Sequence, residues 1–332
     1  MNILFTTGEG STKQIYFPPF TLQALERLGT VTYNPHARAL TPHELASSIA
    51  DVEVCLTHWG CPTFTEEVLS RADRLKLIAH AAGSVANLVT PLVYERGIKV
   101  CSANTIMAKA VAEGVLAYIL CGLRWIPQQA YDLQHKKLWR PRVVAVKSLH
   151  GAKISLVGLG TIGRFLLDLL KPFNVQVKVY DPYVSPASLS EFPNVTLASL
   201  EEVLAWGEIV SIHASLTTET RGMLNANRLA LIRDGALFVN TARGAIVDEQ
   251  ALAHELKSGR LYGVLDVYTR EPLPPDSPLY DLENVTLQPH TAGCTAREAM
   301  SVVMIEEIAR FQKGEPLLYE IPYAKYILMT KE

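Results

Sequence analysis

The chain has 332 residues, of which 48% are hydrophobic and 19% charged, and its formal net charge is -2 at pH 7. This balance is typical of a globular protein with sizeable cores, and it argues against a disordered chain and against a broad basic surface for nucleic acid or anionic lipid. The length favours about two domains.

The cysteines and the apolar stretches indicate the compartment. The five cysteines are dispersed and form no C-x-x-C pair, so we expect no disulfide framework, no metal site and a reducing, cytoplasmic location. We also expect no membrane span, because the longest strongly apolar stretch, at residues 114–123, is shorter than the roughly 20 residues that cross a bilayer.

Short apolar runs that are typical of buried strands alternate with longer helical patterns. They lie at residues 2–6, 52–57, 75–79, 99–102, 153–158, 175–181, 208–213, 236–241, 263–267 and 285–288. Such an alternation predicts parallel sheets covered by helices on both faces. A break near residue 103, followed by a helical pattern over 104–124, divides the chain into two α/β domains. A capping-box pattern at Thr295 and Glu298 predicts a helix that ends near residue 312.

A glycine-rich loop follows the first strand of the second domain. Gly158, Gly160 and Gly163 form a G-x-G-x-x-G pattern between a strand and a helix. Such glycines permit a tight turn and close approach to a pyrophosphate, which the helix N-terminus attracts. The next strand ends at Asp181, where a carboxylate would accept hydrogen bonds from ribose hydroxyls and repel a 2'-phosphate. The pattern predicts a dinucleotide site that prefers NAD to NADP, although a nucleoside-cofactor methyltransferase can carry a similar loop and acid.

Polar motifs stand just past the ends of three later strands, at residues 240–244, 266–274 and 288–293. Open α/β sheets bind ligands at this edge. Arg243, Glu271 and His290 could therefore converge beside a nicotinamide ring as substrate clamp, histidine partner and proton donor. Structural roles remain open for each: an ion-pairing arginine, a turn carboxylate before proline and a helix-entry histidine.

With these motifs, the sequence resembles the D-isomer-specific 2-hydroxyacid dehydrogenase family over nearly its whole length. Segments at residues 75–83, 110–113 and 216–220 add to the resemblance. It implies two doubly wound parallel-sheet domains, a Rossmann NAD-binding domain and a flavodoxin-like substrate domain, with the active-site cleft between them. The substrate domain would comprise residues 1–103 and 295–332, with the terminal helix packed back on the first segment. The NAD-binding domain would comprise residues 104–294 and form a homodimer.

The resemblance also assigns roles. Arg243 would bind a small D-2-hydroxy acid or 2-oxo acid of the glyoxylate, hydroxypyruvate, glycerate or phosphoglycerate type. Glu271 would pair with His290, the general acid/base for hydride transfer with NAD. The rest of the substrate site would come from a loop with free backbone N–H groups, at Ala82, Gly83 and Ser84.

The expected cofactor site consists of the glycine-rich loop, Asp181 and residues at or after the ends of later strands in the second domain. Asp266 matches the position that contacts the nicotinamide carboxamide, whereas for His213, at a strand end near the cofactor, a structural role is favoured over a cofactor contact. The full set is Gly158, Gly160, Thr161, Ile162, Gly163, Asp181, His213, Thr241, Ala242, Asp266 and Gly293.

The chain departs from the family pattern in places. Ala82 and Ala86 stand where the substrate loop usually has glycine and aspartate, in a Gly-x-Gly-x-Asp pattern, so we expect an unusual pocket. Ser155 replaces a frequent glycine. Two alternatives stay open: a formate dehydrogenase, which would carry glutamine at Glu271, and a non-enzymatic NAD(H)-sensing scaffold similar to the C-terminal-binding corepressors. The role of the tail after Glu315 is not predicted.

Overall fold

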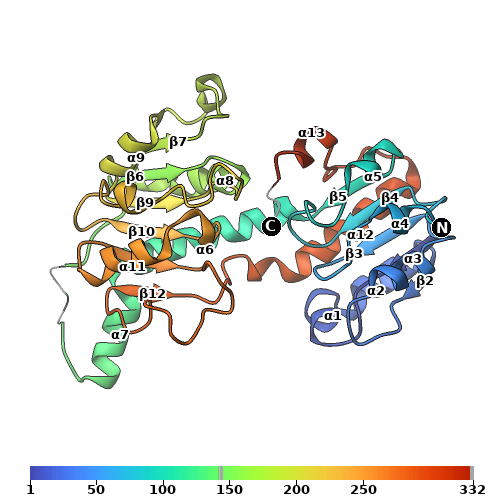
Figure 1. Ribbon diagram of the computed structural model, residues 1–332, viewed down its shortest axis with the longest axis horizontal. Helices are drawn as coiled ribbons and strands as arrows, with labels where there is room; N and C mark the ends of the chain where they lie inside the picture. The colour runs from blue at the N-terminus through green and yellow to red at the C-terminus, as the bar shows by residue number, and fades with distance from the viewer. Residues whose placement is uncertain (141, 143–144, 330–332) are drawn as a thin grey trace. The chain divides into compact units, whose positions relative to one another are not determined.

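The computed structural model describes residues 1–140, 142 and 145–329, and the chain divides into two compact units (Figure 1). One unit consists of Met1–Met107 and Cys294–Glu332, and the other of Ala108–Gly293. The expected boundaries, at residues 103 and 294, lie near these positions. They differ because one continuous helix, α6 (Asn104–Arg124), crosses the first boundary.

The first unit is built on a parallel sheet with the strand order β2-β1-β3-β4-β5. All residues of β3 and β4 are buried, which explains their continuous apolar sequence. The edge strand β2 was not predicted, because its alternating Thr-Val-Thr-Tyr sequence is largely exposed. The strands are β1 (Asn2–Phe5), β2 (Thr30–Tyr33), β3 (Val54–Thr57), β4 (Leu77–His80) and β5 (Lys99–Ser102).

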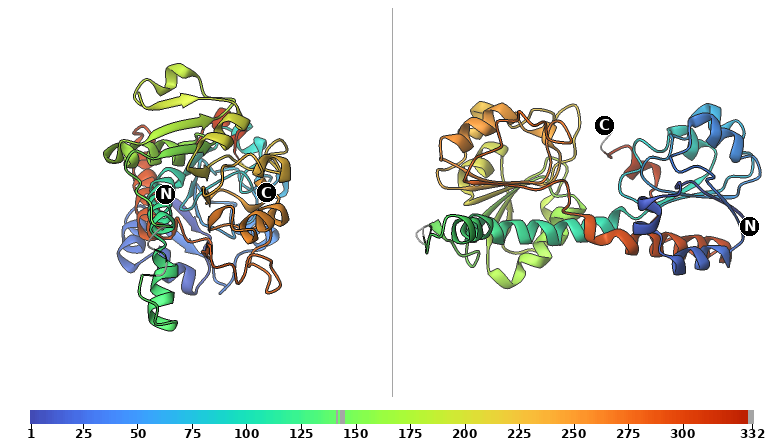
Figure 2. Two further views of the ribbon diagram at one scale, coloured as in Figure 1. Left: turned by 90° about the vertical axis from the view of Figure 1, so that its left-hand side faces the viewer. Right: turned by 90° about the horizontal axis from the view of Figure 1, so that it is seen from below.

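The helices of this unit include the last long helix of the chain, α12. It packs against β4 and beside α1 and α2, which is the return of the terminal helix that the family resemblance implies (Figure 2). The predicted capping box is wrong: Thr295 lies in a 3-10 turn (Cys294–Ala296), and Ala296 precedes α12 without a side-chain cap. The helices are α1 (Ser11–Tyr16), α2 (Pro19–Glu26), α3 (Pro42–Ser48), α4 (Glu66–Leu69), α5 (Pro91–Glu95), α12 (Arg297–Lys313) and α13 (Tyr323–Tyr326).

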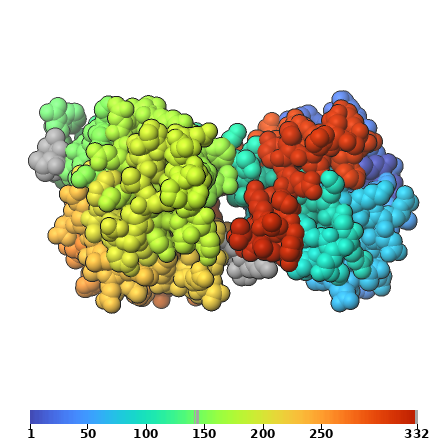
Figure 3. Space-filling view, turned by 90° about the horizontal axis from the view of Figure 1, so that it is seen from above, coloured from blue at the N-terminus to red at the C-terminus, as the bar shows by residue number. Residues whose placement is uncertain are grey.

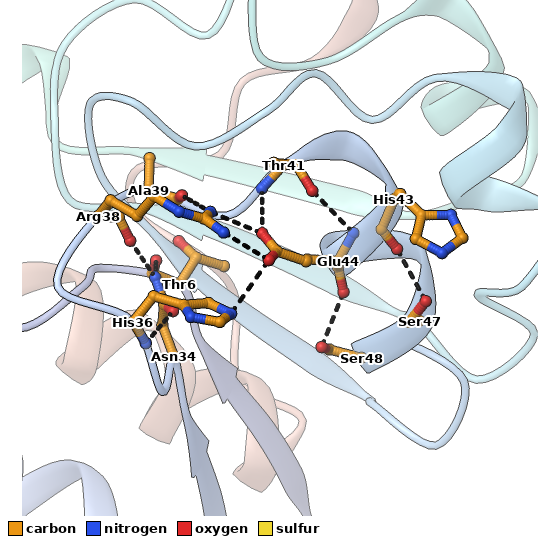
Figure 4. Close-up of polar contacts among 10 residues, drawn as sticks. All are labelled: Thr6, Asn34, His36, Arg38, Ala39, Thr41, His43, Glu44, Ser47 and Ser48. Carbon is orange, nitrogen blue, oxygen red and sulfur yellow. Dashed lines mark hydrogen bonds and ion pairs between the residues drawn. The ribbon is translucent and has the colours of Figure 1, made fainter.

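A capping box does begin α3, and it also fixes the loop that enters the helix (Figure 4). Glu44 accepts hydrogen bonds from the Thr41 amide at 2.7 Å and from two nitrogens of Arg38 at 2.7 and 2.8 Å, while His36 Nε2 lies 3.1 Å away. The Arg38 guanidinium and the Thr41 amide hold the pKa of the Glu44 carboxyl well below its usual range. One carboxylate thus ties the loop that follows β2 to the start of α3.

The second unit is built on a larger parallel sheet with the order β12-β11-β10-β9-β6-β7-β8. The order reverses between β6 and β9, and ligands of such sheets bind at the carboxyl ends of the strands beside this point. The edge strand β8 was not predicted, because it contains only three residues. The strands are β6 (Lys153–Val157), β7 (Gln176–Tyr180), β8 (Val195–Leu197), β9 (Ile209–Ile212), β10 (Leu237–Asn240), β11 (Tyr262–Leu265) and β12 (Val285–Leu287).

Short helices connect these strands. They are α7 (Ile126–His135), α8 (Thr161–Leu170), α9 (Leu200–Trp206), α10 (Ala226–Leu229) and α11 (Glu249–Lys257), with 3-10 helices at Lys171–Phe173, Pro186–Leu189 and Gly244–Ile246.

Helix α6 has the bounds of the helical pattern that the sequence predicted over residues 104–124, and it is apolar over most of its length. It has 21 residues and a mean hydropathy of 1.7 over its most apolar window, so by length and composition alone it could span a membrane. Core helices pass the same test, and this helix has a core face. A Cβ on Gly122 would lie 2.8 Å from Leu237 and 3.1 Å from Val264, so the glycine lets α6 approach β10 and β11 closely.

Candidate active site

A histidine–carboxylate pair lies past the ends of β11 and β12. Nδ1 of His290 is 2.7 Å from Oε2 of Glu271, whose other oxygen accepts a hydrogen bond from the Tyr268 amide at 3.0 Å. About half of the His290 side chain is exposed. A carboxylate at Nδ1 fixes the ring orientation and leaves Nε2 for a ligand, which is the arrangement of a general acid/base.

Asp266 holds the backbone that carries this histidine. Its side chain is buried, and its oxygens accept hydrogen bonds from the amides of Thr291 at 2.8 Å and Ala292 at 3.1 Å and from the Tyr118 hydroxyl at 3.1 Å. His290 itself has a φ of 54°, in the left-handed region that non-glycine residues rarely adopt. Asp266 therefore positions His290, a role that the sequence did not predict.

Tyr268 is a second organising residue that sequence reasoning missed. Its hydroxyl lies 3.0 Å from the Leu265 carbonyl and 2.9 Å from the Gln288 carbonyl, to either of which it can donate its one hydrogen, and it accepts from the Gln288 amide at 3.1 Å. The hydroxyl thus joins the ends of β11 and β12. Tyr268 stands inside the motif at residues 266–274, but the sequence does not indicate which backbone groups its hydroxyl reaches, so only the fold reveals this function.

Arg243 follows β10, the next strand of the sheet. Asn240 clamps its loop, accepting from the Ala242 amide at 3.1 Å and donating to the Arg243 carbonyl at 3.2 Å. A Cβ on Gly244 would lie 1.9 Å from the Tyr268 backbone carbon, so only glycine permits this loop to pack against the segment that leads to Glu271. The three candidate residues thus come from three adjacent strand ends.

The glycine loop lies at the point where the strand order reverses. Gly158 has a φ of 93°, and a Cβ there would lie 2.5 Å from the Ala214 amide nitrogen, so the loops after β6 and β9 require this glycine. Gly160 differs: a Cβ there would meet no atom within 4 Å, and no side chain caps the helix α8 that follows. Thr161 and Ile162 begin this helix, whose N-terminus is therefore open to an anion.

Asp181 lies next to this loop, as predicted. Its Oδ2 accepts from the Leu159 amide at 2.8 Å and its Oδ1 from the Tyr183 amide at 2.9 Å. A carboxylate has about four acceptor positions, so capacity remains for ribose hydroxyls.

The ends of β9 and β10 contribute two further expected residues. Within the described part of the chain, the buried Thr241 hydroxyl has no hydrogen-bond partner, which is unusual for a buried polar group. His213 Nε2 lies 3.0 Å from the Ser211 hydroxyl, and burial lowers the pKa of His213 to about 4, so the ring is neutral near pH 7. An open helix terminus, an available carboxylate and an unpaired hydroxyl fit a dinucleotide. No cluster of three or more metal-ligating side chains occurs among the described residues.

The expected substrate loop follows β4 in the first unit. The Ser102 hydroxyl lies within hydrogen-bond distance of the carbonyls of Ala82, at 3.2 Å, and of Gly83, and can donate its one hydrogen to either. In the described ranges, no group accepts a hydrogen bond from the amides of Gly83 and Ser84. Two free amides of this kind suit a carboxylate.

Comparisons with known proteins show which family the chain is similar to. Residues 116–292 match the family described as D-isomer specific 2-hydroxyacid dehydrogenase, NAD binding domain. A D-3-phosphoglycerate dehydrogenase of Methanocaldococcus jannaschii is 33% identical over 89% of this chain and 56% of its own length. A glyoxylate reductase of Thermofilum pendens is 36% identical over 75% of each chain. The chain spans about half the length of the first curated relatives that it matches.

Solved structures agree with these similarities. A protein from Thermus thermophilus superposes with a TM-score of 0.78 and 31% identity, covering 97% of this chain and 100% of that one. A D-mandelate dehydrogenase of Rhodotorula graminis superposes with a TM-score of 0.80 at 21% identity, over 96% of this chain and 97% of its own, which supports the fold alone.

Proposed function

Because the chain belongs to the D-isomer specific 2-hydroxyacid dehydrogenase family, we propose that it is an NAD-dependent oxidoreductase of a small D-2-hydroxy acid and its 2-oxo acid. The observation that carries the proposal is the 2.7 Å contact between His290 and Glu271, past the ends of β11 and β12, where sheets of this kind bind their ligands. Glutamate at position 271 also disfavours a formate dehydrogenase.

The cofactor supplies hydride transfer at its nicotinamide ring. The amides at the start of α8 would hold its pyrophosphate, Asp181 its ribose hydroxyls, and the Thr241 hydroxyl a polar group near the end of β10. Asp181 favours NAD, because its carboxylate would repel the 2'-phosphate of NADP.

His290 would move the proton. In the reducing direction, its ring gives a proton to the oxygen that forms the new hydroxyl, and in the oxidising direction it takes that proton back. Glu271 fixes the ring tautomer and stabilises the positive charge of the protonated ring. A positioned general acid of this kind contributes roughly 10² to 10⁴ in rate.

Arg243 and the substrate loop would hold the acid. A guanidinium is a planar fork that can bind a carboxylate oxygen and the carbonyl oxygen together. The amides of Gly83 and Ser84, which have no hydrogen-bond acceptor among the described residues, would bind the other carboxylate oxygen. Glyoxylate, hydroxypyruvate, glycerate and phosphoglycerate are the candidate types of substrate.

We further propose a cytoplasmic homodimer that forms through the second unit. Helix α7 and the residues after it expose large apolar side chains, as interfaces do; these include Ile126, Tyr131, Leu133, Leu138 and Trp139. Light scattering in solution would measure the mass directly.

A substrate panel tests the proposed activity. Protein and NADH are mixed with glyoxylate, hydroxypyruvate, pyruvate and phenylpyruvate, and the nicotinamide absorbance is followed. We expect oxidation of NADH with at least one 2-oxo acid. Tight NADH binding without turnover of any acid would instead support the non-enzymatic scaffold.

A further inference from the structure

The segment after α12 returns along the first unit toward the loop that follows β4. The Ser102 amide donates to the Tyr319 carbonyl at 3.1 Å, and the Ile321 amide donates to the Val100 carbonyl at 2.8 Å. The segment therefore adds an antiparallel bridge to the edge strand β5. Figure 3 shows these C-terminal residues, in red, against the teal residues of the same unit.

Beyond this bridge, Tyr326 of α13 anchors the end of the substrate loop. Its side chain is 2% exposed, and its hydroxyl donates to the Val89 carbonyl at 2.9 Å. Its ring centroid lies 5.2 Å from that of Tyr94. The Val89 amide in turn donates to the Val85 carbonyl at 3.1 Å, so the anchor reaches the turn that follows Ser84.

Met329, which follows α13 in the chain, contacts the same loop. It packs on the apolar cluster that contains Val85, Leu88 and Val89, and its sulfur lies 3.9 Å from the Ser84 hydroxyl. That hydroxyl also accepts a hydrogen bond from the Ala86 amide at 3.2 Å. The C-terminal segment thus contacts the loop at Ser84 and at Val89.

The loop lacks one polar contact of its own, at residue 86. Ala86 occupies the position where the family pattern has aspartate, and a methyl group cannot accept hydrogen bonds from neighbouring amides. Ser102 holds the start of the loop, but residue 86 provides no polar side chain to hold its end. The buried Tyr326 hydroxyl supplies a polar contact there.

We propose that Tyr326 and Met329 are positioning residues, which keep the loop at residues 82–89 in the arrangement that presents the Gly83 and Ser84 amides to the substrate carboxylate. This inference rests on the proposed function for its effect on catalysis. The ordering of the loop itself is measurable without turnover.

The test compares Tyr326→Phe with Tyr323→Phe. The first variant removes the hydroxyl that donates to Val89 and keeps the ring, while the second alters a half-exposed tyrosine in the same short helix. The loss of one buried hydrogen bond changes an equilibrium constant by about two- to tenfold. We therefore expect Tyr326→Phe to raise KM for the 2-oxo acid by about that factor, with a smaller change in kcat and no change in the Kd of NADH. Tyr323→Phe should match the unchanged protein.

Hydrogen exchange provides the second readout. The amides of Ala86, Leu88 and Val89 are hydrogen-bonded within the loop, and we expect Tyr326→Phe, and independently Met329→Ala, to accelerate their exchange. Faster exchange in a protein that turns over no 2-oxo acid would retain the positioning role and refute the proposed activity. If the enzyme is active but the variants show unchanged exchange and unchanged KM, the positioning role is overturned and the proposed activity stands. A lower melting temperature, with neither faster exchange in the loop nor a higher KM, would also overturn the positioning role.

Discussion

Asp181 joins two backbone segments of the cofactor unit. Its two oxygens accept amides from Leu159, in the glycine loop, and from Tyr183, after β7. The same carboxylate is the expected acceptor for the ribose hydroxyls, so its removal should change both the loop and the choice of cofactor.

We expect Asp181→Ser to weaken NAD binding by roughly 10- to 100-fold, as loss of a charged hydrogen bond does, and to favour NADP relatively. The measurement is the ratio of the two dissociation constants, obtained by fluorescence titration. Asp181→Asn is the matched control, because it retains an acceptor without the charge. A stronger preference for NAD in the serine variant would contradict the ribose contact.

Also at the residue scale, the sequence identified candidate site residues, but it did not indicate all the hydrogen bonds that they form. Glu271 and His290 could be paired because both stand past strand ends in recognisable motifs. The prediction that Asp266 contacts the nicotinamide carboxamide stays a prediction, and the structure adds that its buried carboxylate holds the amides after His290. The partners of a buried carboxylate are set by tertiary packing, which residue spacing does not encode.

At the scale of the element, two glycines in the loop between β6 and α8 have different surroundings, and we expect different effects when each is replaced by alanine. A methyl group on Gly158 would collide with the backbone at Ala214, whereas one on Gly160 would enter open space. The first glycine is required by the protein itself, and the second leaves room for a ligand.

Gly160→Ala should therefore fold normally and bind NADH at least about tenfold more weakly, because the methyl group occupies space needed for close approach of the pyrophosphate. Calorimetry would measure both the melting temperature and the affinity. Gly158→Ala is the contrast and should lower the melting temperature. Unchanged NADH affinity in a folded Gly160→Ala protein would show that the pyrophosphate does not bind at this loop.

Elements with strong patterns were predicted, and weak edge elements were not. The buried strands stand out as continuous apolar runs, whereas β2 is largely exposed and β8 has three residues. Ser155 was noted as a departure; its hydroxyl donates to the Val203 carbonyl at 2.5 Å and so ties β6 to α9. The serine at position 155 is explained by its hydrogen bond to Val203, which is distant in the sequence.

For the whole molecule, two buried histidines link stability to pH. Burial lowers the pKa of His58 to about 4, and burial together with the nearby His58 lowers that of His80 to about 3. Below pH 6.5 the unfolded chain binds protons at these positions that the folded chain excludes. The free energy of unfolding should therefore fall as the pH drops from about 6.5 to about 4, by up to about 1.4 kcal/mol per pH unit for each histidine.

His58→Phe tests this dependence. Neither ring nitrogen of His58 has a partner among the described residues, and the ring packs against Tyr16, Phe17 and Trp59, so a phenyl ring should be accommodated. Urea unfolding at several pH values should show a smaller loss of stability on acidification. His43→Gln, at a side chain that is 77% exposed, should leave the slope unchanged. An unaltered slope in His58→Phe would refute the burial effect.

Chain topology at this scale was predicted only through the family resemblance. Periodicity indicated two α/β units, but nothing in it required residues 294–332 to join the first one. The contact of Met329 with the loop after β4 spans most of the chain length. Local patterns cannot specify such a contact, because it depends on where α12 ends.

The most direct test of the account is the turnover of His290→Gln. With the active 2-oxo acid saturating, kcat is followed by NADH absorbance, and the Kd of NADH is measured in parallel. We predict a fall in kcat of roughly 10² or more, because glutamine cannot donate the proton, with NADH affinity nearly intact. An unchanged kcat would exclude His290 from proton transfer.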